Sequence, residues 1–121
     1  MIAPAKVVQA FFYVSDTGKR PVREWLPSLA IADRKAIGED IATLEYAWPV
    51  GMPKCAAITR VKGLFEVRSS LATGRIARVF FCLSEGRMVL LHGFEKKTQK
   101  TPDKELKLAI ARMKDVQRHA R

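Results

Sequence analysis

Two almost continuously apolar segments, separated by a short polar turn, constrain the fold of this chain most strongly. They cover residues 76–83 and 88–94, and the sequence Ser84-Glu85-Gly86-Arg87 between them carries a glycine where a tight hairpin needs a positive φ. Segments this apolar are typical of strands that are covered on both faces of a sheet. The sequence therefore predicts a central β-hairpin.

The remaining elements are predicted from hydrophobic periodicity and from helix and turn signals. They are, in order, a strand at 6–14, a short helix at 20–26, a helix from an N-cap at Asp33 to Trp48, a loop at 50–60, a strand at 64–70 and a helix that begins around 101–103. The order β-α-α-β-β-β-α predicts a small α+β domain that spans residues 1–121. Its sheet is expected to be mostly antiparallel, with a helical pair on one side and the C-terminal helix nearby.

The charge of the chain indicates a polyanionic or acidic partner. Lys and Arg number 22 against 12 Asp and Glu, which gives a formal net charge of +10. Such a balance favours nucleic acid, an anionic membrane or an acidic protein as partner. The N-terminal segment lacks an apolar stretch long enough for a signal peptide or a membrane span. The expected location is the cytoplasm.

No cofactor or metal is predicted. The two cysteines, Cys55 and Cys82, have a spacing that fits neither a zinc site nor a redox pair, and Cys82 lies inside a predicted strand as a small buried residue. The sequence contains no HExxH pattern, carboxylate cluster or Cys/His grouping. A disulfide is not expected either, which agrees with a reducing compartment.

Basic residues cluster directly after the second apolar segment. Lys96, Lys97, Gln99 and Lys100 follow it, and Arg78 lies within the first segment. Arginine suits the stabilisation of a phosphorane because its planar fork is bidentate and always charged, and a lysine can serve as a base when burial and nearby cations lower its pKa. These residues and Arg68 are therefore candidates for binding the phosphates of a nucleic acid. The alternative for Lys96, Lys97 and Lys100 is a solvated run of lysines before the helix.

The register of the strands tests this hypothesis. Arg68 and Arg78 lie opposite each other on one face only if the connection between their strands has an odd number of residues, so a two-residue Thr73-Gly74 turn would separate them. Arg78 could instead form a structural ion pair with Glu66. Three further basic residues are expected to contact RNA backbone, namely Lys54, Arg60 and Lys62.

His92 is a tempting general acid, but a two-residue Glu85-Gly86 turn would pair it with Val79, away from the Arg78 face. We therefore expect His92 to be a satisfied core or edge histidine. Trp25 and Trp48 are likewise expected in the core rather than as platforms for base stacking.

Three segments resemble the phage-derived HigB-like branch of the RelE/ParE toxin superfamily. They are GLFEVR at 63–68, RIARVFF at 75–81 and LLHGFEKKTQKTP at 90–102, and residues 16–26 and 105–111 are similar as well. The resemblance covers nearly the whole chain, and the segment from Gly93 to Pro102 is its most specific part. It implies a RelE-like fold.

The function that this resemblance implies is that of a ribosome-dependent mRNA endoribonuclease, the toxin of a type II toxin–antitoxin system. The implied catalytic positions are Arg68, Arg78 and Lys96 or Lys97. The implied partners are the 70S ribosome with its mRNA and a cognate antitoxin, a HigA-like helix-turn-helix DNA-binding protein, in a toxin–antitoxin hetero-oligomer. A tyrosine or histidine that transfers protons in some relatives has no clear counterpart, since the C-terminal helix contains no tyrosine.

Two other functions remain open from the sequence. The basic surface could bind nucleic acid or an acidic protein without catalysis, in which case affinity would fall steeply with salt. A ParE-like inhibitor of DNA gyrase is the third reading, because one fold can carry several activities.

Overall fold

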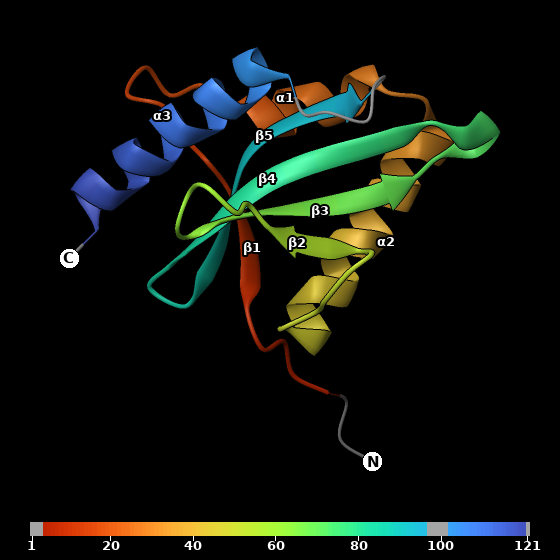
Figure 1. Cartoon of the computed structure of the whole chain (residues 1–121), viewed down its shortest axis with the longest axis horizontal. Coiled ribbons are helices and arrows are strands. Elements are labelled where there is room, and N and C mark those ends of the chain that lie inside the picture. Colours follow the sequence, from red (N-terminus) through yellow and green to blue (C-terminus); the bar gives the residue numbers. More distant parts are fainter. Residues whose placement is uncertain (1–3, 97–101, 121) are drawn as a thin grey trace.

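The computed structural model describes residues 4–96 and 102–120 (Figure 1). Three α-helices and two 3₁₀ turns accompany five strands in these ranges. In chain order they are β1 (Gln9–Phe12), α1 (Pro21–Trp25), η1 (Leu26–Ser28), α2 (Ile31–Ala47), β2 (Cys55–Ala57), β3 (Leu64–Ser70), η2 (Ala72–Gly74), β4 (Ile76–Ser84), β5 (Arg87–Lys96) and α3 (Asp103–His119).

The five strands form one sheet in the order β1-β5-β4-β3-β2. β1 runs parallel to β5, and the other neighbouring pairs are antiparallel. The predicted α+β class with a mostly antiparallel sheet is thus confirmed, and the hairpin of β4 and β5 lies at its centre.

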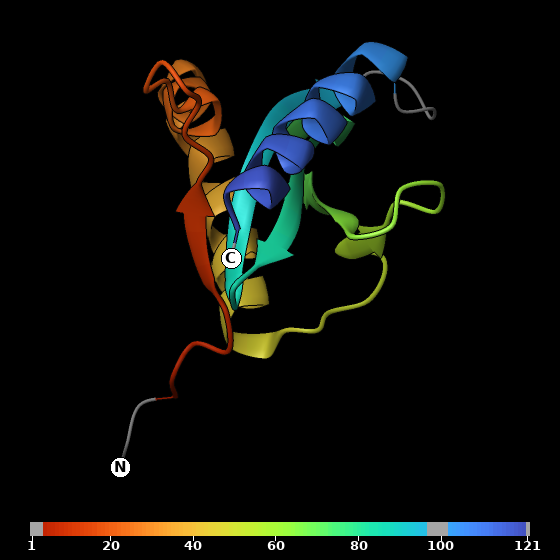
Figure 2. The same cartoon turned by 90° about the vertical axis from the view of Figure 1, so that its left-hand side faces the viewer.

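Helices cover the sheet on both faces (Figure 2). The residues Ile37 and Leu44 of α2 pack with Phe81 and other apolar side chains on one face, where α1 contributes Val22. The helix α3 covers part of the opposite face through Ala109 and Met113. The helical pair on one side is therefore confirmed, and the C-terminal helix lies across the sheet from it.

Both cysteines are free and buried; the burial was predicted for Cys82, whereas Cys55 lay in a predicted loop. Burial raises the pKa of each thiol to about 11, so both stay protonated at neutral pH. No helix in the described ranges is long and apolar enough to cross a membrane.

The predicted two-residue turn of the central hairpin is confirmed, but the pairing expected beyond it is wrong. Glu85 and Gly86 both have positive φ, 53° and 76°, as a turn of this type requires. A β-bulge lies between Phe80 and Phe81, so His92 pairs with Phe80 and not with Val79. The extra residue of a bulge reverses the direction of the side chains that follow it. His92 consequently lies on the same face as Arg78.

Two local predictions need correction. The expected loop at 50–60 contains the short edge strand β2, which pairs with only three residues of β3. The helix α2 begins at Ile31, with Ala30 before it, so Asp33 lies in the first turn and is not the N-cap.

The C-terminal helix α3 begins at Asp103, within the predicted start at 101–103. Thr101, the predicted capping residue, lies outside the described residues.

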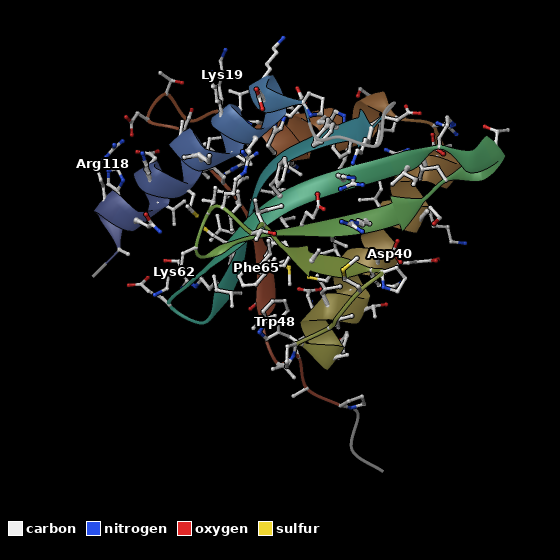
Figure 3. The ribbon with its side chains drawn as sticks, viewed as in Figure 1. Lys19, Asp40, Trp48, Lys62, Phe65 and Arg118 are labelled. Atoms are coloured by element: carbon white, nitrogen blue, oxygen red, sulfur yellow. The ribbon has the colours of Figure 1, made fainter. Side chains whose placement is uncertain are left out.

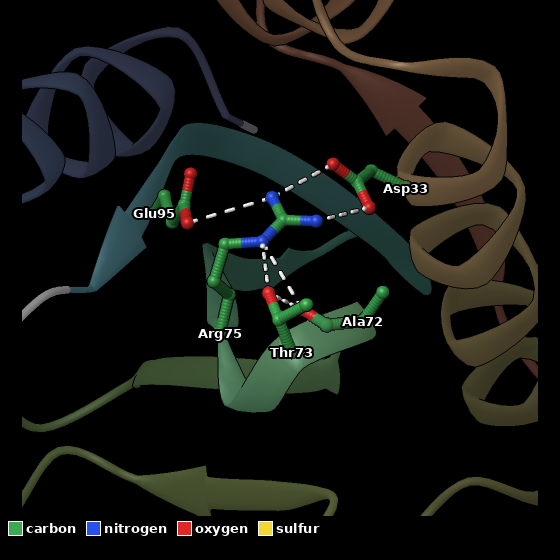
Figure 4. A network of polar contacts seen from close by, with 5 residues as sticks. All are labelled: Asp33, Ala72, Thr73, Arg75 and Glu95. Carbon is green, nitrogen blue, oxygen red and sulfur yellow. Dashed lines mark hydrogen bonds and ion pairs between the residues drawn. The ribbon is translucent and has the colours of Figure 1, made fainter.

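Asp33 instead forms an ion pair with Arg75, directly before β4 and at the end of the hairpin opposite its turn (Figure 4). Arg75 donates to both carboxylate oxygens of Asp33 at 2.9 and 3.0 Å and to the carbonyl oxygen of Ala72 at 3.1 Å. It also lies 3.5 Å from Glu95 of β5. These contacts tie the β3–β4 connection to α2 and β5, and they fix the end of the sheet that carries the candidate site.

Gly93 in β5 is required by the packing of Trp25, and its substitution gives a first prediction. A Cβ atom at this position would overlap the indole ring of Trp25. We expect Gly93→Ala to lower the free energy of unfolding by about 2–3 kcal/mol, because overpacking forces the indole or the strand to move. Urea denaturation followed by tryptophan fluorescence measures it. In the control Gly38→Ala, the new methyl group meets open space in a helix, and stability should rise by about 0.5–1 kcal/mol. Equal effects of the two variants would contradict the prediction.

Candidate functional site

The two candidate arginines of the central sheet lie directly opposite each other. Ser70 of β3 pairs with Ile76 of β4, so the connection has five residues, and Arg68 pairs with Arg78. The odd number meets the condition derived from the sequence, and the separating Thr73-Gly74 turn does not occur. Both side chains therefore lie on the face that α3 covers only in part.

A buried carboxylate lies between the two guanidinium groups. Oε1 of Glu66 accepts a hydrogen bond from Nη1 of Arg78 at 2.6 Å, and it lies 3.1 and 3.0 Å from Nε and Nη2 of Arg68. Glu66 is 2% exposed and Arg78 is 8% exposed, whereas the Arg68 side chain keeps 29% of its surface. The ion pair that the sequence suggested for Arg78 is present, and Arg68 is the guanidinium that a ligand can reach.

Lys96 completes this group from β5. It lies two residues beyond Phe94, which pairs with Arg78, so its side chain is on the same face. Burial lowers the pKa of Lys96, and the positive charges of Arg78 and Arg68 lower it further, against an opposing effect of Glu66. We call Glu66, Arg68, Arg78 and Lys96 the arginine–lysine cluster. The candidates Lys97, Gln99 and Lys100 lie outside the described residues.

The structure separates the three predicted backbone-contacting residues. Lys54 lies directly before β2, where its carbonyl oxygen accepts a hydrogen bond from the Arg68 amide at 2.7 Å, and its ammonium group pairs with Asp40 of α2. Arg60 and Lys62 are exposed in the turn before β3, and the first residue of that strand lies about 13 Å along it from Arg68. Figure 3 shows Lys62 on one side of Phe65 and Asp40 of α2, the partner of Lys54, on the other side. Only Lys54 lies beside the arginine–lysine cluster.

An open groove of about 540 Å³ extends from the two arginines over the edge of β3 to α2. β2 pairs with β3 only from Phe65 to Val67, and the groove follows the edge of β3 beyond the hydrogen bond between the Arg68 amide and the Lys54 carbonyl. It is lined by Ala36, Glu39, Asp40, Pro53, Lys54, Arg68, Ser70, Ile76 and Arg78. We call it the β3–α2 groove.

His92 is a satisfied histidine, as predicted, although it lies on the same face as Arg78. Its Nε2 lies 2.9 Å from a carboxylate oxygen of Glu105, and Arg112 lies 3.1 Å from its Nδ1. The ring stacks on Phe94 with 5.9 Å between centroids. Both ring nitrogens are therefore engaged by α3, and we assign His92 to the attachment of that helix.

Trp48 also behaves as predicted, because its indole packs edge-on against Phe65 and Phe81 in the core. Trp25 is partly buried against the same cluster. Neither ring is a platform on the face of the arginine–lysine cluster.

Residues with the spacing of metal ligands lie elsewhere. In the part of the chain that the structure describes, Asp16, Asp115 and His119 have ligand atoms within 4.8 Å of one another. They line a separate pocket with Ser84 and Glu85, at the turn end of the central hairpin. The arginine–lysine cluster supplies positive charge for binding phosphate, and Lys96, whose pKa is lowered by burial and by the two arginines, can accept a proton in its neutral form.

Two site residues are prominent in the structure and were not site candidates from the sequence. Glu66 was considered only as a structural partner of Arg78, yet it contacts both arginines. Asp40 lies among other charged residues of a predicted helix, and a carboxylate at such a position does not by itself indicate a functional site. The alternation of Leu64, Glu66 and Arg68 was the available sign that Glu66 shares the face of Arg68.

Comparison with protein families gives one match. The model for the family described as "Phage derived protein Gp49-like (DUF891)" matches residues 24–114, which is well over half of the chain. The matched region contains the whole arginine–lysine cluster and the β3–α2 groove. A comparison with curated proteins gives no match. The chain therefore belongs to the phage-derived Gp49-like family, a family of RelE/HigB-like toxins.

Proposed function

We propose that this protein is a HigB-type toxin of a type II toxin–antitoxin system that cleaves mRNA on the ribosome. The observation that carries the proposal is the arginine–lysine cluster, in which two arginines in register and a lysine of lowered pKa surround one buried carboxylate. Family membership supports the toxin class, and the net charge of +10 supports an RNA substrate.

Cleavage would use the 2′-hydroxyl of RNA as the nucleophile. Lys96 in its neutral form takes the proton of the 2′-hydroxyl, whose oxygen attacks the adjacent phosphorus. Arg68 stabilises the charge that develops on the phosphorane oxygens, and Glu66 with Arg78 holds that arginine in place. The bond to the 5′ oxygen then breaks, which leaves a 2′,3′-cyclic phosphate, and a second donor protonates the leaving oxygen. Lys97 is the nearest candidate in sequence for that donor.

This mechanism depends on alignment by the ribosome. Holding a 2′-hydroxyl in line with the scissile bond contributes much of the rate in such reactions. A shallow cationic face binds RNA backbone but does not by itself impose that geometry. We therefore expect free RNA to be cleaved far more slowly than translated mRNA.

The proposal is tested by primer extension on a reporter mRNA after brief induction. Cuts should occur in phase with codons on the translated message and disappear when its start codon is removed. A wild-type protein that arrests growth without cutting the message would overturn the proposal. Gyrase trapped on DNA in those cells would then identify a ParE-like activity.

The role of Lys96 gives a second prediction. Because burial and two arginines lower its pKa, a larger fraction is neutral near pH 7 than for an ordinary lysine, and the cleavage rate should rise with pH up to that pKa. Lys96→Arg keeps the charge but removes the base, so we expect a loss of about 10²–10⁴-fold and no rise with pH. Single-turnover cleavage on programmed ribosomes between about pH 6 and 9 measures both. An unchanged pH profile in Lys96→Arg would show that Lys96 only binds phosphate.

A cognate antitoxin is the implied protein partner. We propose a HigA-like helix-turn-helix protein that forms a hetero-oligomer with this chain and presents acidic residues to the basic surface, since opposite charge accelerates association. A binding surface that included the arginine–lysine cluster would explain neutralisation by exclusion of mRNA.

A further inference from the structure

We infer that the β3–α2 groove is a base-binding subsite that selects guanine in the RNA substrate. The inference rests on the proposed function, because it takes the arginine–lysine cluster as the position of the phosphate. Arg68 and Arg78 line the groove, so it is continuous with that cluster. A nucleotide whose phosphate contacts Arg68 can therefore direct its base into the groove.

The groove has the size and the walls of a subsite for one base. Its volume of about 540 Å³ is in the range of pockets that hold small ligands. Ala36, Pro53 and Ile76 supply apolar surface. The partly exposed Arg68 lies at the boundary with the cluster, where its guanidinium plane can stack on a base.

The far wall of the groove carries two carboxylates against one lysine, which disfavours a second phosphate as its occupant. Glu39 and Asp40 line it from α2, although the chain as a whole is strongly basic. Carboxylates repel phosphate and accept hydrogen bonds from N–H groups. The wall therefore matches a neutral group that presents donors, as the exocyclic and ring N–H groups of bases do.

Guanine fits the donors and acceptors of this wall better than the other RNA bases. The wall offers two carboxylates as acceptors and the ammonium group of Lys54 as a donor, and Lys54 is held beside Asp40 by an ion pair. The Watson–Crick edge of guanine has two donors, N1–H and the N2 amino group, next to the acceptor O6. Cytosine and uracil each offer one donor with two acceptors, and adenine offers one of each. The complementary arrangement is thus found only in guanine.

Binding of oligonucleotides that cannot be cleaved tests this inference apart from catalysis. The probes are two fluorescent 2′-O-methyl hexanucleotides that differ only in one central base, guanine or uracil, and affinity is measured by fluorescence anisotropy. We expect the wild-type protein to bind the guanine probe about tenfold more tightly, because a good bidentate pair discriminates by about 1–3 kcal/mol. Asp40→Asn should reduce the ratio of the two affinities to below about twofold.

The ratio is the decisive quantity, because loss of a negative charge strengthens binding of any RNA. Asp16→Asn is the matched control, since Asp16 is exposed and lines the separate pocket at the other end of the sheet, and it should keep the tenfold ratio. Equal binding of both probes by the wild type, or a full preference in Asp40→Asn, would overturn the inference even if mRNA is cut. A guanine preference without any cutting of mRNA would support the groove and overturn the ribonuclease proposal.

Discussion

Arg68→Ala is expected to lower the rate of mRNA cleavage by about 10²–10³-fold while the protein remains folded. Loss of one preorganised charge contact to a transition state typically has this effect. The Arg68 side chain is 29% exposed, and Glu66 keeps its shorter contact with Arg78 in the variant. Stability should therefore change little. Single-turnover cleavage of ribosome-bound mRNA and urea denaturation measure the two quantities on the same preparation.

Arg68→Lys and Arg87→Ala are the controls for this prediction. Lysine keeps the charge but lacks the planar fork that grips phosphate at two points, so the rate should fall between those of wild type and Arg68→Ala. Arg87 is an exposed arginine on the same sheet, at the start of β5, where it stacks on Phe11. Its removal should leave cleavage within about twofold of wild type. A rate for Arg68→Ala equal to that for Arg87→Ala would remove Arg68 from the site.

The sequence was sufficient to predict the sheet and its central hairpin, because these depend on local patterns. Alternating and continuous apolar segments identified three of the five strands closely, and Glu85-Gly86 identified the turn. The strand β2 was missed because three residues, Cys55 to Ala57, are too few to show a period. The bulge beside Phe80 was missed for another reason. A two-residue turn predicts continuous pairing along the hairpin, and Gly93, a glycine inside the predicted strand, was the one nearby residue typical of a bulge.

The part of the candidate site that depends on the register of β3 and β4 was predictable from the sequence. The part that depends on the packing of α2 beside β3 was not. The sequence placed Arg68 opposite Arg78 only on the condition that the connection between their strands has an odd number of residues. The five-residue connection in the structure meets this condition. The groove requires α2 to lie beside the uncovered edge of β3, which brings Asp40 to Lys54 across 14 positions of sequence. Hydrophobic periodicity does not indicate such a contact, because in the sequence Asp40 is one of several charged residues on a predicted helix.

Glu66→Leu is expected to lower the free energy of unfolding by about 3–5 kcal/mol. The substitution leaves the guanidinium of Arg78, which is 8% exposed, without its carboxylate, and an uncompensated buried charge has a cost of this size. Arg68 can turn toward water, so most of the effect should come from Arg78. Urea denaturation followed by the fluorescence of Trp25 and Trp48 measures it.

The double variant Glu66→Leu with Arg78→Met separates stability from function. Replacing both members of a buried ion pair by apolar side chains of similar volume is often neutral or stabilising, and Phe80 and Phe94 provide an apolar surrounding on this face. We expect the double variant to recover most of the lost stability and still to cleave mRNA at least about 10²-fold more slowly than wild type, because Arg68 has lost the groups that position it. Full recovery of cleavage together with stability would show that Glu66 and Arg78 only hold the fold, and that Arg68 and Lys96 act without them.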